Sequence, residues 1–121
     1  ELEMFLGMSY EDAQEFDFRG TNQGSQLAGN ADLWTSGELL NNPAFGSSGF
    51  NALPGGYRNW DGGNYSSMGE TIVFWSSSVT IGYDAWTRQP HYSSSQVYRT
   101  GIYHTSTYYH RNGYSLRCLG D

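Results

Sequence analysis

One strongly apolar segment limits what this chain can fold into. Residues Thr71 to Trp75 are all β-branched or aromatic, which is typical of a buried strand, and Ser76–Ser78 follow it. A shorter apolar run, Phe50–Leu53, comes earlier and is ended by Pro54-Gly55-Gly56. A turn-rich loop lies between the two runs. We therefore expect a strand, a long loop and a buried strand to form the unit on which the rest of the chain packs.

The composition indicates one small domain with a core of aromatic rings. At 121 residues the chain can bury one core, and we expect residues 1–121 to form a single domain. Aromatic residues make up 17% of the chain and the whole apolar set only 37%, so rings have to supply much of the core. Rings pack well on a pleated sheet. The 16 glycines indicate many turns and little long helix.

The charge distribution argues against two classes of partner. The formal net charge is −6 and the chain has no lysine, which is unfavourable for binding a phosphate backbone or an anionic membrane surface. No apolar run approaches the roughly 20 residues that a membrane helix needs. We therefore expect no nucleic-acid partner and no membrane insertion.

The pattern predicts short helices first and antiparallel strands afterwards. Residues 1–7 are expected to form the last turns of an amphipathic helix, with an apolar side of Leu2, Met4, Phe5 and Leu6. Ser9 is the expected N-cap of a second short helix over residues 9–16. Residues 17–48 have little periodicity and are expected to form a long connection, with a helical turn near residues 37–40.

Alternation predicts the later strands. They are expected over residues 83–88, over 96–100 with an extension to 104, and over 113–119. The last of these would place Tyr114, Leu116 and Cys118 on one face, with Cys118 buried. The predicted class is α+β, with short N-terminal helices, long loops and a small twisted antiparallel sheet.

Several strings in the same order resemble one known family. They are Gly49–Asn59, Phe74–Ser78, Ala85-Trp86, Val97–Arg99 and Gly113–Cys118. Together they resemble the Fibrobacter succinogenes major paralogous domain, found in secreted and surface proteins of Bacteroidetes and Fibrobacteres. The resemblance implies a C-type-lectin-like fold, related to formylglycine-generating and sulfatase-modifying domains. Family members begin further upstream, so this chain is expected to be the C-terminal two-thirds of such a domain.

The resemblance also bears on Cys118, the only cysteine of the chain. In the family, an upstream cysteine would be its disulfide partner. The missing upstream strand would leave an open sheet edge, which favours pairing with another chain. A cleaved segment or a separate chain could supply that strand.

The loop after residue 57 holds the candidate ligand site. Trp60 can stack on a sugar while Arg58, Asn59, Asp61 and Asn64 bind its hydroxyl groups, and Tyr83 and Trp86 are candidates to lie near it. Asn59, Asp61 and Asn64 also carry oxygen ligands that suit Ca²⁺, although Asn, Asp and Gly are ordinary turn formers too. Trp75, inside the apolar run, is expected to be a core ring, and the alternative for the others is that Trp86 is a core ring and Trp60 a loop anchor. We expect no obligatory cofactor, with Ca²⁺ as the alternative.

The sequence carries little that indicates catalysis. It has no Gly-x-Ser-x-Gly motif, and the cysteines of the related modifying enzymes are absent. His91, His104 and His110 match no local zinc motif, and two of them flank tyrosine-rich strands and are expected at the surface. Asp61, Glu70 and Asp84 could supply paired carboxylates for a glycosidase.

These observations lead to three functional hypotheses. The first is a non-catalytic extracellular or cell-surface domain for recognition or adhesion, with polysaccharide as the first ligand class. The second is a structural subunit of a surface filament or homo-oligomer that another chain completes, as the tyrosine-, serine- and asparagine-rich surface suggests. The third is a hydrolase or modifying enzyme.

Overall fold

A computed structural model of the chain describes residues 1–79, 85–101 and 111–118. It is an α+β fold of short helices and a small antiparallel sheet, as the sequence predicts. In chain order the elements are α1 (Leu2–Phe5), α2 (Tyr10–Gln14), β1 (Asp17–Arg19), α3 (Gln23–Leu27), the 3-10 helix η1 (Ala31–Leu33), α4 (Glu38–Asn41), β2 (Tyr57–Arg58), β3 (Tyr65–Ser66), β4 (Phe74–Val79), β5 (Ala85–His91) and β6 (Ser94–Gly101).

The main sheet has four strands in the order β1-β6-β5-β4, and all neighbours are antiparallel. β2 and β3 form a separate two-stranded hairpin. The segment over residues 111–118 links the two sheets, because Gly113 bridges to Arg58 of β2 and Ser115 bridges to Phe74 of β4. The chain therefore positions the hairpin against the edge of the main sheet through backbone hydrogen bonds.

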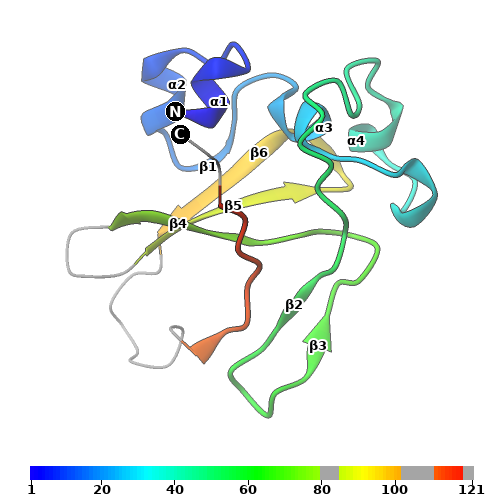
Figure 1. Cartoon of the computed structure of the whole chain (residues 1–121), viewed down its shortest axis with the longest axis vertical. Helices are drawn as coiled ribbons and strands as arrows, with labels where there is room; N and C mark the ends of the chain where they lie inside the picture. Colours follow the sequence, from blue (N-terminus) through cyan, green and yellow to red (C-terminus); the bar gives the residue numbers. More distant parts are fainter. Residues whose placement is uncertain (80–84, 102–110, 119–121) are drawn as a thin grey trace.

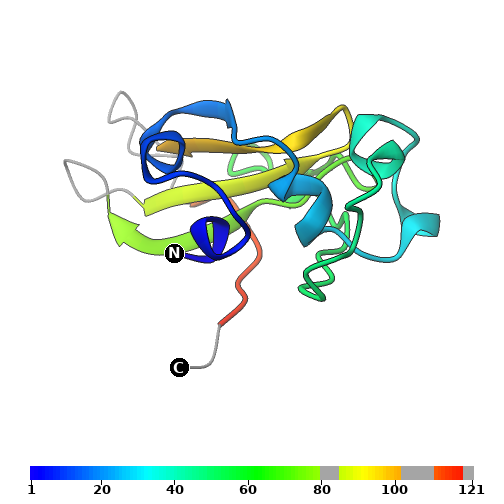
Figure 2. The same cartoon turned by 90° about the horizontal axis from the view of Figure 1, so that it is seen from above.

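The helices lie on one side of the main sheet and the β2–β3 hairpin on the other (Figures 1 and 2). Because side chains alternate along a strand, each strand contributes to both faces. The helix face carries Arg19, Arg88, Val97 and Arg99. We call the other side, which carries Phe18, Gln89 and Tyr98, the far face; these three residues are direct cross-strand neighbours.

The hydrophobic core lies where α3, η1 and α4 meet the sheet. Its buried members are Ala28, Trp34, Leu39, Ala52 and Ile72, and the half-buried rings of Phe45, Phe50, Phe74 and Tyr92 pack around them. Aromatic residues thus supply much of the core, as the composition predicts. The expected connection over residues 17–48 is more regular than predicted, since it contains β1, α3, η1 and α4. The expected helical turn near residues 37–40 is confirmed by α4.

The first helices confirm one prediction and correct another. Ser9 caps α2, accepting a hydrogen bond from the backbone N–H of Asp12 at 3.0 Å. The predicted apolar side of α1 is wrong: Phe5 is 88% exposed, and the buried residue is Glu3. The reason is electrostatic, because the Glu3 carboxylate contacts both Arg19 and Arg88 beneath the helix.

The predicted strands are shifted or shortened in two places. The strand expected at residues 71–75 begins regular pairing only at Phe74, while Thr71 and Ile72 form single bridges. The apolar run at residues 50–53 contributes one bridge, through Ala52. Ala52, Ile72 and Val73 are buried, whereas Leu53 is 42% exposed.

The predicted C-terminal strand is not formed as expected. Gly113 and Ser115 make isolated bridges, but Leu116 is 77% exposed and Cys118 is exposed as well. The expected burial of Cys118 is therefore wrong, whereas Tyr114 is half-buried and packs against Tyr57 and Trp75. Pairing ends at Ser115 because this segment lies across the gap between β2 and β4 and does not continue along either strand. Among the described residues, no helix is long and apolar enough to cross a membrane.

Candidate functional site

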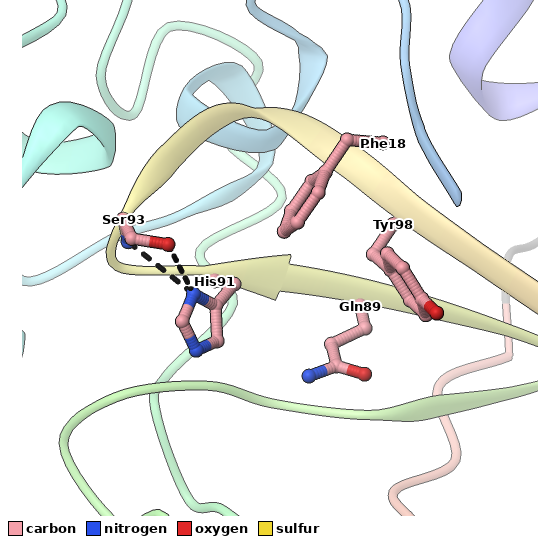
Figure 3. Close-up of a pocket in the computed structure, with 5 residues that line it drawn as sticks. All are labelled: Phe18, Gln89, His91, Ser93 and Tyr98. Atoms are coloured by element: carbon pink, nitrogen blue, oxygen red, sulfur yellow. Dashed lines mark hydrogen bonds between the residues drawn. The ribbon is translucent and has the colours of Figure 1, made fainter.

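An open depression on the far face of the sheet brings together rings and polar groups. It has a volume of about 230 Å³ and is lined by Phe18, Gln89, His91, Ser93 and Tyr98 (Figure 3). Phe18 comes from β1, Tyr98 from β6, and Gln89 and His91 from β5. The site therefore combines β1 with a hairpin that is distant from it in sequence and consists of β5, the turn that holds Ser93, and β6.

The strand register positions these side chains. Phe18 is the cross-strand partner of Tyr98, and Tyr98 is the partner of Gln89. Because neighbouring residues across an antiparallel sheet project to the same face, the three side chains form one row. His91 follows Gln89 by two residues and so shares its face, at the end of β5 where the chain turns back.

The rings of the depression contact one another edge to face. The centroids of Phe18 and Tyr98 are 5.1 Å apart with an interplanar angle of 66°. Phe18 and His91 are 6.3 Å apart at 62°. Such edge-to-face pairs are a preferred aromatic geometry, so the rings hold one another in place. Phe18 is still 40% exposed, which leaves ring surface available to a ligand.

The hydrogen bonds of His91 fix which ring nitrogen carries the proton. The backbone N–H of Ser93 donates to Nδ1 of His91 at 3.3 Å, and the Ser93 hydroxyl lies 2.8 Å from the same nitrogen. Since Nδ1 accepts the backbone N–H, the proton of the neutral ring sits on Nε2. Burial lowers the pKa of His91, and the nearby charge of Glu70 partly opposes that effect. The ring is therefore neutral at physiological pH.

Tyr98 is linked to a carboxylate at the other end of the depression. Burial raises the pKa of Tyr98, and the hydrogen bond that its hydroxyl donates to Asp17, together with the charge of Asp17, raises it further. Asp17 has a φ of 60°, a left-handed conformation that Asp and Asn tolerate better than most residues. The carboxylate is exposed and lies beside the phenol oxygen.

The candidate residues of the sequence prediction lie elsewhere, on the β2–β3 hairpin. Arg58 is in β2, and Asn59, Trp60, Asp61 and Asn64 are in the loop between the two strands. The loop is closed by a hydrogen bond from Asn59 N–H to Asn64 O at 2.8 Å. Five of the seven predicted ligand residues are thus adjacent on one hairpin.

Two of these residues are already engaged within the protein. The Asn59 amide donates to Ser66 Oγ at 2.9 Å, and the Trp60 backbone N–H donates to Asn112 Oδ1 at 2.8 Å. The Arg58 guanidinium lies directly over Gly63, where a Cβ would collide with it. Asp61 and Asn64 are exposed. The hairpin thus presents polar side chains, some of which are held by hydrogen bonds within the protein.

Trp86 does not join the hairpin residues. It lies on the helix face, where its ring packs 5.2 Å from Phe16 and the Arg99 guanidinium stacks on it at 3.7 Å. Its interpretation as a packing ring is therefore the one that its contacts favour. Tyr83 and Asp84 lie outside the described residues, as do His104 and His110.

No metal centre is visible in the part of the chain that the structure describes. There, no group of three or more His, Cys, Asp and Glu side chains is placed to hold an ion. Asp61 is the one carboxylate of the proposed Asn59, Asp61 and Asn64 calcium set. The absence of a cofactor stays a prediction.

The sequence analysis missed Phe18, Gln89, Ser93 and Tyr98 as site residues. It placed Phe18 inside a long connection and His91 at an unspecified surface position. The available signal was the alternation of residues 96–100, which predicts that Val97 and Tyr98 face opposite sides. Nothing local, however, indicates that β1 pairs with β6, since the two strands are almost eighty residues apart in sequence, as the Phe18–Tyr98 pair shows.

The comparison with protein families gives one match. The family model described as the Fibrobacter succinogenes major domain matches residues 1–119. No curated protein and no solved structure matches the chain.

Proposed function

The chain belongs to the Fibrobacter succinogenes major domain family, and we propose that it is a non-catalytic recognition or adhesion domain with a polysaccharide ligand. The observation that supports this proposal is the far-face depression, where two aromatic rings border an amide, an imidazole and a hydroxyl. We place the protein in the extracellular space or at the cell surface. The proposal includes a C-type-lectin-like relationship, which the short N-terminal helices and the loop-rich antiparallel sheet support.

The side chains of the depression suit the two kinds of surface that a sugar presents. The faces of a pyranose ring carry C–H groups, which pack on aromatic rings such as Phe18 and Tyr98. The hydroxyl groups around its edge need donors and acceptors, and the Gln89 amide offers both. His91 Nε2–H adds a donor. A small number of aimed polar groups among rings is the usual composition of a ligand site.

The geometry favours binding over cleavage. The depression is a shallow surface on a rigid sheet, which can accept a section of a long chain from either end. The described residues that line it include no pair of carboxylates. Nδ1 of His91 makes hydrogen bonds with both the hydroxyl group and the backbone N–H of Ser93. These two hydrogen bonds, formed within the turn that holds Ser93, orient the ring of His91.

Glycan-binding measurements test the proposal. A glycan survey should find a ligand for the wild-type protein, and isothermal titration should then show at least about a tenfold loss of affinity for Tyr98→Ala and for Gln89→Ala. Tyr10→Ala is the matched control, because Tyr10 is an exposed tyrosine of α2 on the other side of the sheet. Circular dichroism would establish that each variant is folded.

A second pair of variants separates the two candidate surfaces. Trp60→Ala and Asp61→Ala alter the hairpin without touching the depression. If these changes abolish glycan binding while Gln89→Ala leaves it intact, the ligand lies on the hairpin and the far-face site is wrong. If no glycan binds the wild-type protein, the proposed ligand class is wrong.

One observation favours assembly with another chain as a second candidate function. Leu33, Leu53 and Met68 are exposed apolar residues on three adjacent segments, which backbone hydrogen bonds join: Gly69 N–H to Pro54 O at 2.8 Å and Thr35 N–H to Gly69 O at 2.7 Å. Light scattering over a range of concentrations would test it. A monomer at every concentration would contradict it.

A further inference from the structure

We infer that the far-face depression selects saccharides that carry a protonated amine over neutral saccharides of the same shape. This inference rests on the proposed function and names the ligand class for the same site. It follows from where the sheet places its charges, how the rings are arranged, and which groups border the depression at each end.

Strand alternation places the three arginines of the sheet on one face. Arg19, Arg88 and Arg99 all project to the helix face. The first two contact Glu3, at 2.6 and 3.0 Å, and Arg99 stacks on Trp86 and donates to the carbonyl oxygens of Gln14 and Glu15. None of the described side chains that line the depression is an arginine, and the chain has no lysine. An anionic ligand would therefore find no cation there.

A carboxylate borders the depression at each end. Asp17 accepts the hydrogen bond of the Tyr98 hydroxyl, so its negative charge lies beside one wall. Glu70 is close enough to His91 to interact with it electrostatically at the other wall. An ammonium group between the walls would be attracted by both carboxylates. A neutral hydroxyl group in the same place would gain only hydrogen bonds.

The rings add a second attraction for a cation. An ammonium group near the face of an aromatic ring gains about 0.5–1 kcal/mol at an exposed site, and more where water is excluded. Phe18 and Tyr98 stand at 66° to each other, so a group in the angle between them can contact more than one ring. Burial lowers the pKa of His91, which favours the neutral form of the one lining side chain that could carry a positive charge.

The test compares two matched oligosaccharides by isothermal titration. A chitosan oligosaccharide and the cello-oligosaccharide of equal length differ only in having an ammonium group or a hydroxyl group on each ring. The wild-type protein, at mildly acidic pH and low salt, should bind the amino-sugar chain about tenfold more tightly. In Asp17→Asn that preference, taken as the ratio of the two affinities, should fall severalfold. Asn is suited to the positive φ of residue 17, so this variant should fold.

A control of equal charge excludes a general effect of the acidic protein. Glu11→Gln also removes one negative charge, but from α2 on the helix face, and it should retain the full preference. Equal affinity for the two chains, or a preference that Asp17→Asn does not reduce, overturns the inference and leaves the proposed function standing. The same holds if other glycans bind but the chitosan chain does not. If no saccharide binds at all, the proposed function fails together with the inference.

Discussion

The carboxylate of Glu3 lies 2.6 Å from the guanidinium of Arg19, in an ion pair whose side chains are 8% and 2% exposed. The other oxygen of Glu3 lies 3.0 Å from Nε of Arg88. Burial lowers the pKa of Arg19, and the Glu3 charge opposes that effect. The carboxylate of Glu3 thus balances the positive charges of two guanidiniums, one from β1 and one from β5, and holds α1 against the sheet.

Glu3→Gln should destabilise the protein strongly. Removing one partner of a buried ion pair leaves an uncompensated charge and typically costs about 3–5 kcal/mol. Urea denaturation would measure the loss as a lower transition midpoint. Glu11→Gln, which removes an exposed acid from the neighbouring helix, should change the free energy of unfolding by less than about 0.5 kcal/mol. Equal midpoints for the two variants would show that the Glu3 pair contributes little.

The parts of this fold that depend on local signals could be predicted from sequence. Ser9 identifies the start of α2 because a capping hydroxyl and the backbone N–H that donates to it are three residues apart. The alternation after residue 95 identifies β6, and the aromatic content identifies the kind of core. The α+β class follows from those patterns together.

The parts that depend on distant pairs could not be predicted. The composition of α1 favours Phe5 as the buried residue, and only the arginines of β1 and β5 explain why Glu3 is buried instead. Phe18 and Gln89 become site residues because β1 and β5 both pair with β6. A single sequence carries no signal for that register.

Gly24→Ala should destabilise the contact between α3 and β6. A Cβ on Gly24 would collide with the carbonyl oxygen of Gln96 and come within 2.9 Å of that of Ser95, so backbone would have to move. We expect a loss of about 1–3 kcal/mol in the free energy of unfolding, measured in urea. Gly55→Ala is the matched control, because nothing lies within 4 Å of its Cβ position. A larger loss for Gly55→Ala than for Gly24→Ala would contradict this packing.

His91 should make stability depend on pH in the mildly acidic range. Its pKa in the folded protein is below the ordinary value of 6.5, so between the two values the unfolded chain binds more protons. The stabilisation by neutral His91 is therefore complete above pH 6.5 and is lost as the pH falls toward the folded pKa. The free energy of unfolding, measured across this range, should fall more steeply with decreasing pH for the wild type than for His91→Gln. Identical pH profiles of the free energy of unfolding for the two proteins would contradict this prediction.

Asp17→Asn should lower the pKa of Tyr98 toward the ordinary value of 10.0, because the variant removes the charge of Asp17. The pKa should stay above that value, since burial, the larger cause, is unchanged. Titration of ¹³C-labelled tyrosines by NMR would resolve this group. Asp12→Asn, on α2, should leave it unaffected. An unchanged pKa of Tyr98 in Asp17→Asn would show that Asp17 does not interact with the Tyr98 hydroxyl. Amine selectivity at that wall would then have no basis.

Cys118→Ser should leave stability unchanged, because Cys118 is exposed and contributes nothing to the core. We expect a change below about 0.5 kcal/mol in the free energy of unfolding. A thiol reagent should modify the native protein as fast as the denatured one, since no packing shields the sulfur. Slow modification that denaturant accelerates would instead support the buried position expected from sequence. A species of higher mass that reductant releases would show that this sulfur joins another chain, and would favour the assembly hypothesis over recognition alone.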